Sequence, residues 1–286
     1  MTGDETIPTT ARVLVLRTAG TNCDVETAHA FELAGAAVER LHIGCFLRRE
    51  RRLDEFDIVA IPGGFSYGDD LGAGVVLAGQ LRTRLGDDLQ EFVGAGRLVL
   101  GICNGFQVLV RLGILPGWGG EACASLIANR AGKFEDRWVS LRVDCRSSPF
   151  LSFAWDAAPE RRTLRLPVAH GEGRFVLRDP ALLERLEAQG QIAFTYCRPS
   201  ADIAAGGEYP ANPNGSTRDI AGITNQEGNV LGLMPHPERF VHRLQDPLWS
   251  REPTGGADEE SPRGVGSSGQ GIRLFECAVR SVVRRS

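Results

Sequence analysis

The first half of the sequence alternates short apolar runs with segments long enough to form helices. Residues 24–36 carry helical periodicity, and apolar runs of strand length occupy residues 11–16, 38–43, 56–61 and 97–102. Parallel strands need a crossover of about a dozen residues, usually a helix, so this alternation indicates parallel pairing. We therefore expect an α/β fold with a doubly wound, mostly parallel sheet flanked by helices. Reactive groups in such folds gather at the carboxyl ends of the strands.

The pattern changes after residue 120, where segments of strand length dominate. Residues 138–143, 164–168 and 192–196 favour strands, and residues 181–188 favour one helix. These segments either form a second domain or extend the far edge of the same sheet with additional antiparallel strands. The candidate catalytic residues lie on both sides of the change and have to meet in space. We therefore expect a single domain over residues 1–286.

Three segments depart from this pattern. Residues 1–10 are polar and acidic, which predicts a flexible tail. Residues 251–271 contain Gly, Ser, Pro, Asp and Glu with almost no apolar side chains, which is typical of a disordered loop. Residues 272–284 resume an apolar helical pattern with Phe275 and Val279 on one face, and this pattern predicts a helix docked on the domain.

The composition argues against several classes of partner. With 32 basic and 36 acidic residues the formal net charge is −4, so the chain lacks the positive field that non-specific nucleic-acid binding needs. The seven cysteines are an odd number without a Cys-x-x-Cys pair, which disfavours a disulfide framework and a structural metal site. No apolar run reaches the roughly 18 residues of a membrane span. We expect a cytoplasmic protein that binds no metal, nucleic acid or membrane.

The strongest local pattern is a strand, a sharp turn and a helix, with Cys103 at the junction. The apolar run 97–102 precedes the cysteine, and the sequence NGFQVLVRLG follows it. A cysteine in this place lies near a helix N-terminus, whose partial positive charge favours the thiolate. Gly101 and Gly105 would supply a tight turn, because glycine tolerates positive φ. A lone cysteine in an apolar run is more often structural, but the two glycines favour a nucleophile.

His236 and Glu238 are the candidate partners of this nucleophile. They follow the apolar run 230–233 and are interleaved with Pro235 and Pro237. Proline biases the residue before it toward an extended conformation, so the histidine and the glutamate should point to the same side. A capping histidine beside a solvated glutamate is the structural alternative. The pairing with Cys103 favours a general base and the acid that orients it.

Gly63 and Gly64 end another apolar strand. Consecutive glycines free backbone N–H groups to face a developing negative charge, and Gly64 with Asn104, the residue after the candidate nucleophile, would form an oxyanion hole. A Gly-Gly pair in isolation more often marks a plain turn. Its place at a strand end favours the functional interpretation.

Two other segments, one rich in glycine and one rich in arginine, have the composition of a binding site but lack the residue pattern of one. Residues 72–79, GAGVVLAG, match neither a phosphate-binding nor a dinucleotide-binding fingerprint and favour a closely packed helix. Residues 48–52, RRERR, precede two acidic residues and favour a solvated surface.

Taken together, these residues resemble a known family. The segment 101–107, GICNGFQ, resembles the Gly-x-Cys-x-Gly-x-Gln nucleophile motif of class I, triad-type glutamine amidotransferases, and His236 with Glu238 resembles their His-x-Glu pair. Within this family the chain is similar to the glutaminase subunits of phosphoribosylformylglycinamidine synthases. That similarity covers most of residues 11–242, in the segments 17–31, 63–70, 101–109, 129–141, 168–175, 209–216 and 234–240. The resemblance implies a flavodoxin-like fold.

The resemblance also implies a reaction. L-glutamine would bind beside Gly64 and Gln107, Cys103 would attack its amide carbon, and His236 would protonate the departing ammonia before water cleaves the glutamyl thioester. Ammonia would then pass to a separate synthetase subunit, which converts formylglycinamide ribonucleotide to formylglycinamidine ribonucleotide. ATP and magnesium would belong to that synthetase, and a small accessory subunit is compatible with the assembly. No cofactor is expected in this chain.

The candidate catalytic residues alone leave three alternatives open. A glutaminase subunit that serves a different synthase would share them, and a γ-glutamyl hydrolase could use them on the same fold. The third alternative is a catalytically idle interaction module, which the intact triad disfavours. Segments 168–175 and 209–216 argue against the first. His170 and Glu172, in the first of these segments, match the family, but no role follows from their chemistry.

Overall fold

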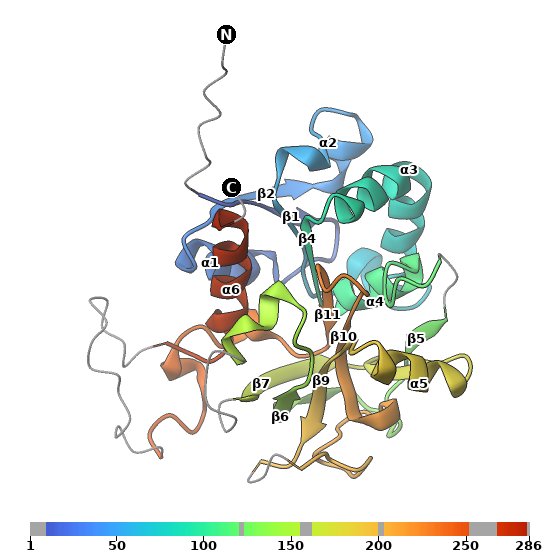
Figure 1. Ribbon diagram of the computed structural model, residues 1–286, viewed down its shortest axis with the longest axis vertical. Coiled ribbons are helices and arrows are strands. Elements are labelled where there is room, and N and C mark those ends of the chain that lie inside the picture. The colour runs from blue at the N-terminus through green and yellow to red at the C-terminus, as the bar shows by residue number, and fades with distance from the viewer. Residues whose placement is uncertain (1–9, 120–122, 155–161, 200–202, 252–267, 285–286) are drawn as a thin grey trace.

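The structure is a computed structural model that describes residues 10–119, 123–154, 162–199, 203–251 and 268–284 (Figure 1). Residues 1–9 of the predicted tail and residues 252–267 of the predicted loop lie outside the described residues. The described residues build one large sheet with helices on both of its faces, and a small second sheet.

Five parallel strands form one half of the large, nine-stranded sheet. They run in the order β2–β1–β3–β4–β11, and each neighbouring pair in this half is parallel. Every residue of β3, β4 and β11 is buried, as expected where helices cover both faces of a parallel sheet. The bounds are β1 (Arg12–Arg17), β2 (Ala37–His42), β3 (Ile58–Ile61), β4 (Leu98–Ile102) and β11 (Val230–Leu233).

Antiparallel strands form the other half of the same sheet. Beyond β11 the order continues as β10–β9–β6–β7, with antiparallel pairing throughout. Their bounds are β10 (Ile220–Thr224), β9 (Ile192–Cys197), β6 (Glu135–Val143) and β7 (Thr163–His170). The second sheet pairs β5 (Ala124–Ile127) with β8 (Arg174–Leu177). The predicted α/β class, including the antiparallel strands in the second half, is confirmed.

The helices form a layer on each face of the sheet. On one face α1 (Asp24–Leu33) packs against α6 (Ile272–Val283), and on the other α3 (Val75–Gly94) packs against α4 (Asn104–Leu112) (Figure 1). Phe31 of α1 and Phe275 of α6 meet edge to face with ring centroids 4.9 Å apart, a contact worth about 1 kcal/mol beyond its buried area. The shorter helices are α2 (Ile43–Leu47) and α5 (Ala181–Ala188). No helix in the described segments is long and apolar enough to cross a bilayer.

The four strands predicted in the first half are present as β1 to β4, with ends within two residues of the predicted ones. Residues 72–79 differ from the prediction of one packed helix. Gly72 and Gly74 have positive φ angles of 107° and 71°, so the chain turns there and α3 begins only at Val75. The helix then continues to Gly94.

Candidate active site

Cys103 occupies a strained turn between β4 and α4. Its φ of 50° and ψ of −102° are rare for a residue with a side chain. Its N–H donates to the carbonyl oxygen of Leu233 at 2.8 Å, which ties the turn to the end of β11. The thiol lies 3.7 Å from the carbonyl oxygen of Ala169. Cys103 therefore contacts both β11 of the parallel half and β7 of the antiparallel half of the sheet.

Gly101 and Gly105 permit this turn for a different reason from the predicted one. The positive φ falls on Cys103 itself, and neither glycine has one. A Cβ on Gly105 would lie 1.9 Å from the carbonyl oxygen of Ile61, and a Cβ on Gly101 would lie 2.5 Å from the side chain of Leu109. The glycines are needed because β3, β4 and α4 pack in direct contact, and this contact fixes the turn.

His236 and Glu238 follow the carboxyl end of β11, the strand that pairs with β4. Both residues are 1% exposed, and Nδ1 of the imidazole lies 2.6 Å from a carboxylate oxygen of Glu238. The two side chains thus meet as predicted, but not through an extended backbone. Pro237–Arg239 forms a 3₁₀ turn, because proline in the first position of a helical turn has the φ that the turn needs.

The surroundings of His236 favour its protonated form. Burial alone would lower its pKa, but the carboxylate of Glu238 and a negative charge on Cys103 outweigh burial, so the pKa lies well above the ordinary 6.5. Cys103 is thus among the groups whose charge acts on the imidazole. Nε2 of His236 is buried and makes no formed hydrogen bond within the described part of the chain. This nitrogen is therefore not committed to another group among the described residues.

Cys23 is a neighbour of the imidazole that the sequence analysis missed. It is fully buried just before α1, and its sulfur lies 4.0 Å from Nδ1 of His236 and 3.0 Å from a guanidinium nitrogen of Arg239. Gly63 makes room for both groups, because a Cβ there would lie 2.7 Å from Cε1 of His236 and 3.2 Å from the sulfur. No local pattern could have found Cys23, since 213 residues separate it from His236.

Cys23, His236 and Glu238 also present three ligand atoms within 4.8 Å of one another. These atoms already have other partners. Nδ1 of His236 is bonded to Glu238, and the Cys23 sulfur is bonded to the cationic Arg239. A metal ion would have to break both contacts beside a positive guanidinium, so the cluster is better suited to charge-assisted hydrogen bonds.

The loop after β3 brings Gly64 close to the same turn. Its φ is 142°, and a Cβ there would lie 2.7 Å from the carbonyl oxygen of Gly20, so only glycine fits. The N–H of Asn104 has no intrahelical acceptor, because this residue begins α4. Across the described ranges neither this N–H nor that of Gly64 donates a hydrogen bond. Both remain available to a substrate oxygen.

Buried amides connect this turn to the loops around it. Asn104 donates from Nδ2 to Oε1 of Gln107 at 3.1 Å and to Oδ1 of Asp69 at 3.2 Å. Gln107 donates in turn to the backbone carbonyl oxygen of Glu172 at 2.6 Å. The amide of Gln107 is thus held between α4 and the chain that follows β7.

A cavity of about 180 Å³ opens beside Cys103. Gly64 and Gln107 border it from the parallel half of the sheet, and His170 and Glu172 border it from the segment at the end of β7. The cavity therefore brings together the candidate nucleophile, two of the candidate glutamine-binding residues and the two residues to which the sequence assigned no role, whereas His236 is not among the residues that line it.

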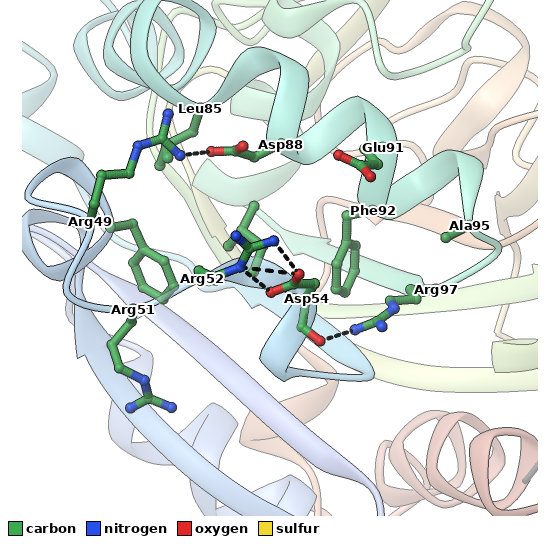
Figure 2. A pocket seen from close by; sticks show the side chains of 12 residues that line it. Arg49, Arg51, Arg52, Asp54, Leu85, Asp88, Glu91, Phe92, Ala95 and Arg97 are labelled. Atoms are coloured by element: carbon green, nitrogen blue, oxygen red, sulfur yellow. Dashed lines mark hydrogen bonds and ion pairs between the residues drawn. The ribbon is translucent and has the colours of Figure 1, made fainter.

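A second cavity, of about 260 Å³, lies at the opposite edge of the sheet and is rich in arginine (Figure 2). Its residues precede β3 and β4, at the amino ends of these strands. Arg49 pairs with Asp88 at 2.6 Å, and Arg52 pairs with Asp54 (Figure 2). Arg97 donates to the backbone carbonyl oxygen of Asp54. These arginines are already matched by oxygen atoms of the protein, as expected for a solvated surface.

Comparison with known proteins assigns the chain to a family. The model of a family described as a CobB/CobQ-like glutamine amidotransferase domain matches residues 10–282. The chain belongs to this family of glutamine amidotransferases.

Two curated relatives and one solved structure show a similarity to a narrower group of proteins. The chain is 45% identical to phosphoribosylformylglycinamidine synthase subunit PurQ of Dehalococcoides mccartyi, over 94% of this chain and 96% of that protein. It is 43% identical to the protein of the same name from Thermus thermophilus, over 82% and 91% of the two chains. Among solved structures it is similar to a chain of PurLQS from Thermotoga maritima, with 30% identity, a TM-score of 0.66 and coverage of 94% and 97%.

Proposed function

We propose that this chain is the glutaminase subunit of a phosphoribosylformylglycinamidine synthase. Its relatives over nearly the whole chain bear that name, and the chain resembles a component of a PurLQS assembly. The observation that carries the proposal is the convergence of Cys103, His236 and Glu238 at the carboxyl ends of two adjacent parallel strands, in a glutamine amidotransferase.

The first step forms a thioester. Cys103 attacks as the thiolate, with His236 already protonated. Its sulfur bonds to the amide carbon of L-glutamine, and the carbonyl oxygen gains negative charge in the tetrahedral intermediate. The free N–H groups of Gly64 and Asn104 would donate to that oxygen, and such donors lower the barrier most when they are fixed before the reaction. The bond from carbon to nitrogen then breaks, and the protonated His236 gives its proton to the leaving ammonia.

The second step regenerates the thiolate and the protonated His236. His236, now neutral, accepts a proton from water, which attacks the thioester carbon, and glutamate leaves as Cys103 is restored. Glu238 holds the imidazole through Nδ1, which leaves Nε2 for the proton transfers of both steps. Gly63 leaves space for the ring, and Gln107 positions the substrate beside the turn.

The proposed partner is a synthetase subunit that consumes the ammonia and forms formylglycinamidine ribonucleotide from formylglycinamide ribonucleotide. ATP and magnesium are assigned to that subunit, together with the activation of the amide oxygen, and a small accessory subunit is part of the same proposal. The assembly named PurLQS, to which one similar chain belongs, supports a complex of this kind. We propose no cofactor and no metal for this chain itself.

The test is glutaminase turnover of the purified chain, alone and with the synthetase subunit from the same organism and its nucleotide ligands. We expect the partner to stimulate glutamate release and to yield formylglycinamidine ribonucleotide without added ammonia. Turnover that ignores the partner, together with equal cleavage of γ-glutamyl peptides, would instead indicate a γ-glutamyl hydrolase. Stimulation by the synthetase of another pathway would indicate a different amidotransferase.

A further inference from the structure

Hydrogen-bond acceptors border the cavity beside Cys103, and cations do not. Asp69 and Glu172 are the carboxylates among the described residues that line it, and no lysine or arginine is among them. A cavity with this charge is suited to a ligand that carries a positive group. The amide that Cys103 would attack is neutral, so recognition of this group does not require the two carboxylates in the cavity.

Asp69 is held in place by an unusual backbone. Its φ is 54°, a left-handed conformation that a residue with a side chain adopts at an energetic cost. Its Oδ1 accepts hydrogen bonds from the N–H of Gly74 and from Nδ2 of Asn104, each at 3.2 Å. Its second oxygen has no partner in the segments that the structure describes. One oxygen thus fixes the carboxylate, and the other remains available.

Glu172 is arranged in the same way on the opposite loop. Its Oε2 accepts from the N–H of Ala73 at 3.3 Å, and its Oε1 has no partner within the described ranges. The two carboxylates also interact, because burial and then the charge of Glu172 raise the pKa of Asp69. A cation bound between them would relieve this repulsion.

His170 contributes a third acceptor, as the hydrogen bonds of Asn129 show. The Nδ2 of Asn129 donates to the carbonyl oxygens of Lys133 and His170, both at 2.8 Å, so its Oδ1 has to be an acceptor. This oxygen lies 3.2 Å from Nδ1 of His170, which therefore carries the proton. Nε2 then carries a lone pair. It is buried, has no partner in the described chain, and belongs to a residue that lines the cavity.

We propose that Asp69, Glu172 and His170 bind the α-ammonium group of the glutamine substrate. An ammonium group offers three N–H donors and no acceptor, and the three residues offer free acceptors without a donor. This proposal rests on the proposed glutaminase function and assigns substrate selection to residues that do not touch the scissile amide. The site would reject an amide that lacks the α-amino group.

Free ammonium has the same donors and is released in the same cavity. Retention of this product by two carboxylates would oppose its transfer to a partner, whereas binding of the α-ammonium aids substrate capture and ends when glutamate leaves. The substrate group is therefore the occupant that the chemistry favours. Added ammonium chloride distinguishes these two occupants. If the carboxylates bind free ammonium, it should inhibit turnover, and substitution of the carboxylates should relieve that inhibition.

The test measures binding separately from turnover. In the complex with the synthetase, a Cys103→Ala chain is titrated calorimetrically with L-glutamine and with glutaramate, which lacks only the α-amino group. Asp69→Asn and Glu172→Gln are added one at a time to this background. Each should weaken glutamine binding by about 10- to 100-fold, the range of a hydrogen bond to a charged group, and leave glutaramate binding unchanged. Asp70→Asn, the adjacent exposed carboxylate, is the matched control and should change neither.

Four outcomes would overturn the proposal. Equal weakening of both ligands would indicate a purely structural role, and unchanged glutamine binding, or no binding at all in the complex, would exclude the site. Relief of ammonium inhibition without a change in glutamine affinity would assign the carboxylates to the product.

In chains that retain Cys103, the same substitutions should raise KM for glutamine with little change in kcat. Selective binding without any hydrolysis would instead contradict the proposed function and leave this inference standing.

Discussion

The two halves of the sheet each contribute a buried histidine to the surroundings of Cys103, and the fold gives the two residues opposite properties. His236 follows β11 in the parallel half, and its pKa lies well above the ordinary 6.5. His170 ends β7 in the antiparallel half, where burial, and then the charge of His236, lowers its pKa to about 3. Both side chains are almost fully buried, so depth alone does not explain the difference.

The neighbours explain it. His236 is bonded to the carboxylate of Glu238, whereas His170 is bonded to the neutral amide oxygen of Asn129. A carboxylate stabilises an imidazolium, and an amide does not compensate for the desolvation of a charge. The parallel half thus supplies a histidine that can carry a proton for chemistry. The antiparallel half supplies one that stays neutral and can only accept or donate a hydrogen bond.

Removal of the nucleophile in the parallel half should have the largest effect on turnover. Cys103→Ala should reduce glutamate release by about 10⁴-fold or more, as loss of a catalytic nucleophile does elsewhere, with an unchanged unfolding midpoint and unchanged partner binding. Cys23→Ala is the matched control, because it removes a buried sulfur beside the same imidazole and leaves the nucleophile. Turnover retained by a folded Cys103→Ala chain would contradict the role of the parallel half.

Neutralisation of Glu238 should have a smaller effect. Glu238→Gln should lower kcat by about 10²- to 10⁴-fold, because the imidazole loses its orienting charge but the nucleophile stays. Without that charge the pKa of His236 falls, so its inflection in the profile of kcat/KM against pH should move to lower pH. In the unsubstituted chain the raised pKa adds stability that is complete below about pH 6.5 and is lost as the pH rises through the folded value. A profile that does not move would exclude this coupling.

The meeting of Cys103 with His236 could be anticipated from the sequence because both follow apolar strands, and the carboxyl ends of neighbouring parallel strands share one edge. The buried strands β3 and β4 were predictable for a related reason, since parallel strands covered on both faces are almost entirely apolar. In each case a local pattern carries the information.

Cys23, Asp69 and Glu172 could not be assigned roles in this way. Their surroundings depend on contacts between loops, such as the hydrogen bond from Ala73 to Glu172 across 99 residues, and a loop has no periodicity to reveal its partners. The left-handed φ of Asp69 is likewise set by tertiary packing. The sequence therefore predicts the groups that would make and break bonds better than those that would select the substrate.

The contrast between the two histidines can be tested through acid stability. As the pH falls from about 6.5 toward 3, the unfolded chain binds a proton at His170 that the folded chain excludes, so folding loses stability. At pH 5 this loss should amount to about 2 kcal/mol. His170→Asn removes the titrating group, so its free energy of unfolding by urea should fall less between pH 7 and pH 5. Parallel declines in both proteins would show that His170 is not held neutral.

The smallest effect is expected at the arginine-rich cavity, which lies outside this comparison at the amino ends of the strands. The pair between Arg49 and Asp88 is short, at 2.6 Å, but its side chains are 67% and 36% exposed, and such pairs stabilise proteins by less than about 1 kcal/mol. Arg49→Ala should therefore change the free energy of unfolding by no more than this and leave turnover unaltered, with Asp88→Ala as the matched partner. A loss of turnover in a stably folded Arg49→Ala chain would mean that residues at the amino ends of the strands influence the active site. Chemistry and substrate selection would then not be confined to the carboxyl ends of the strands.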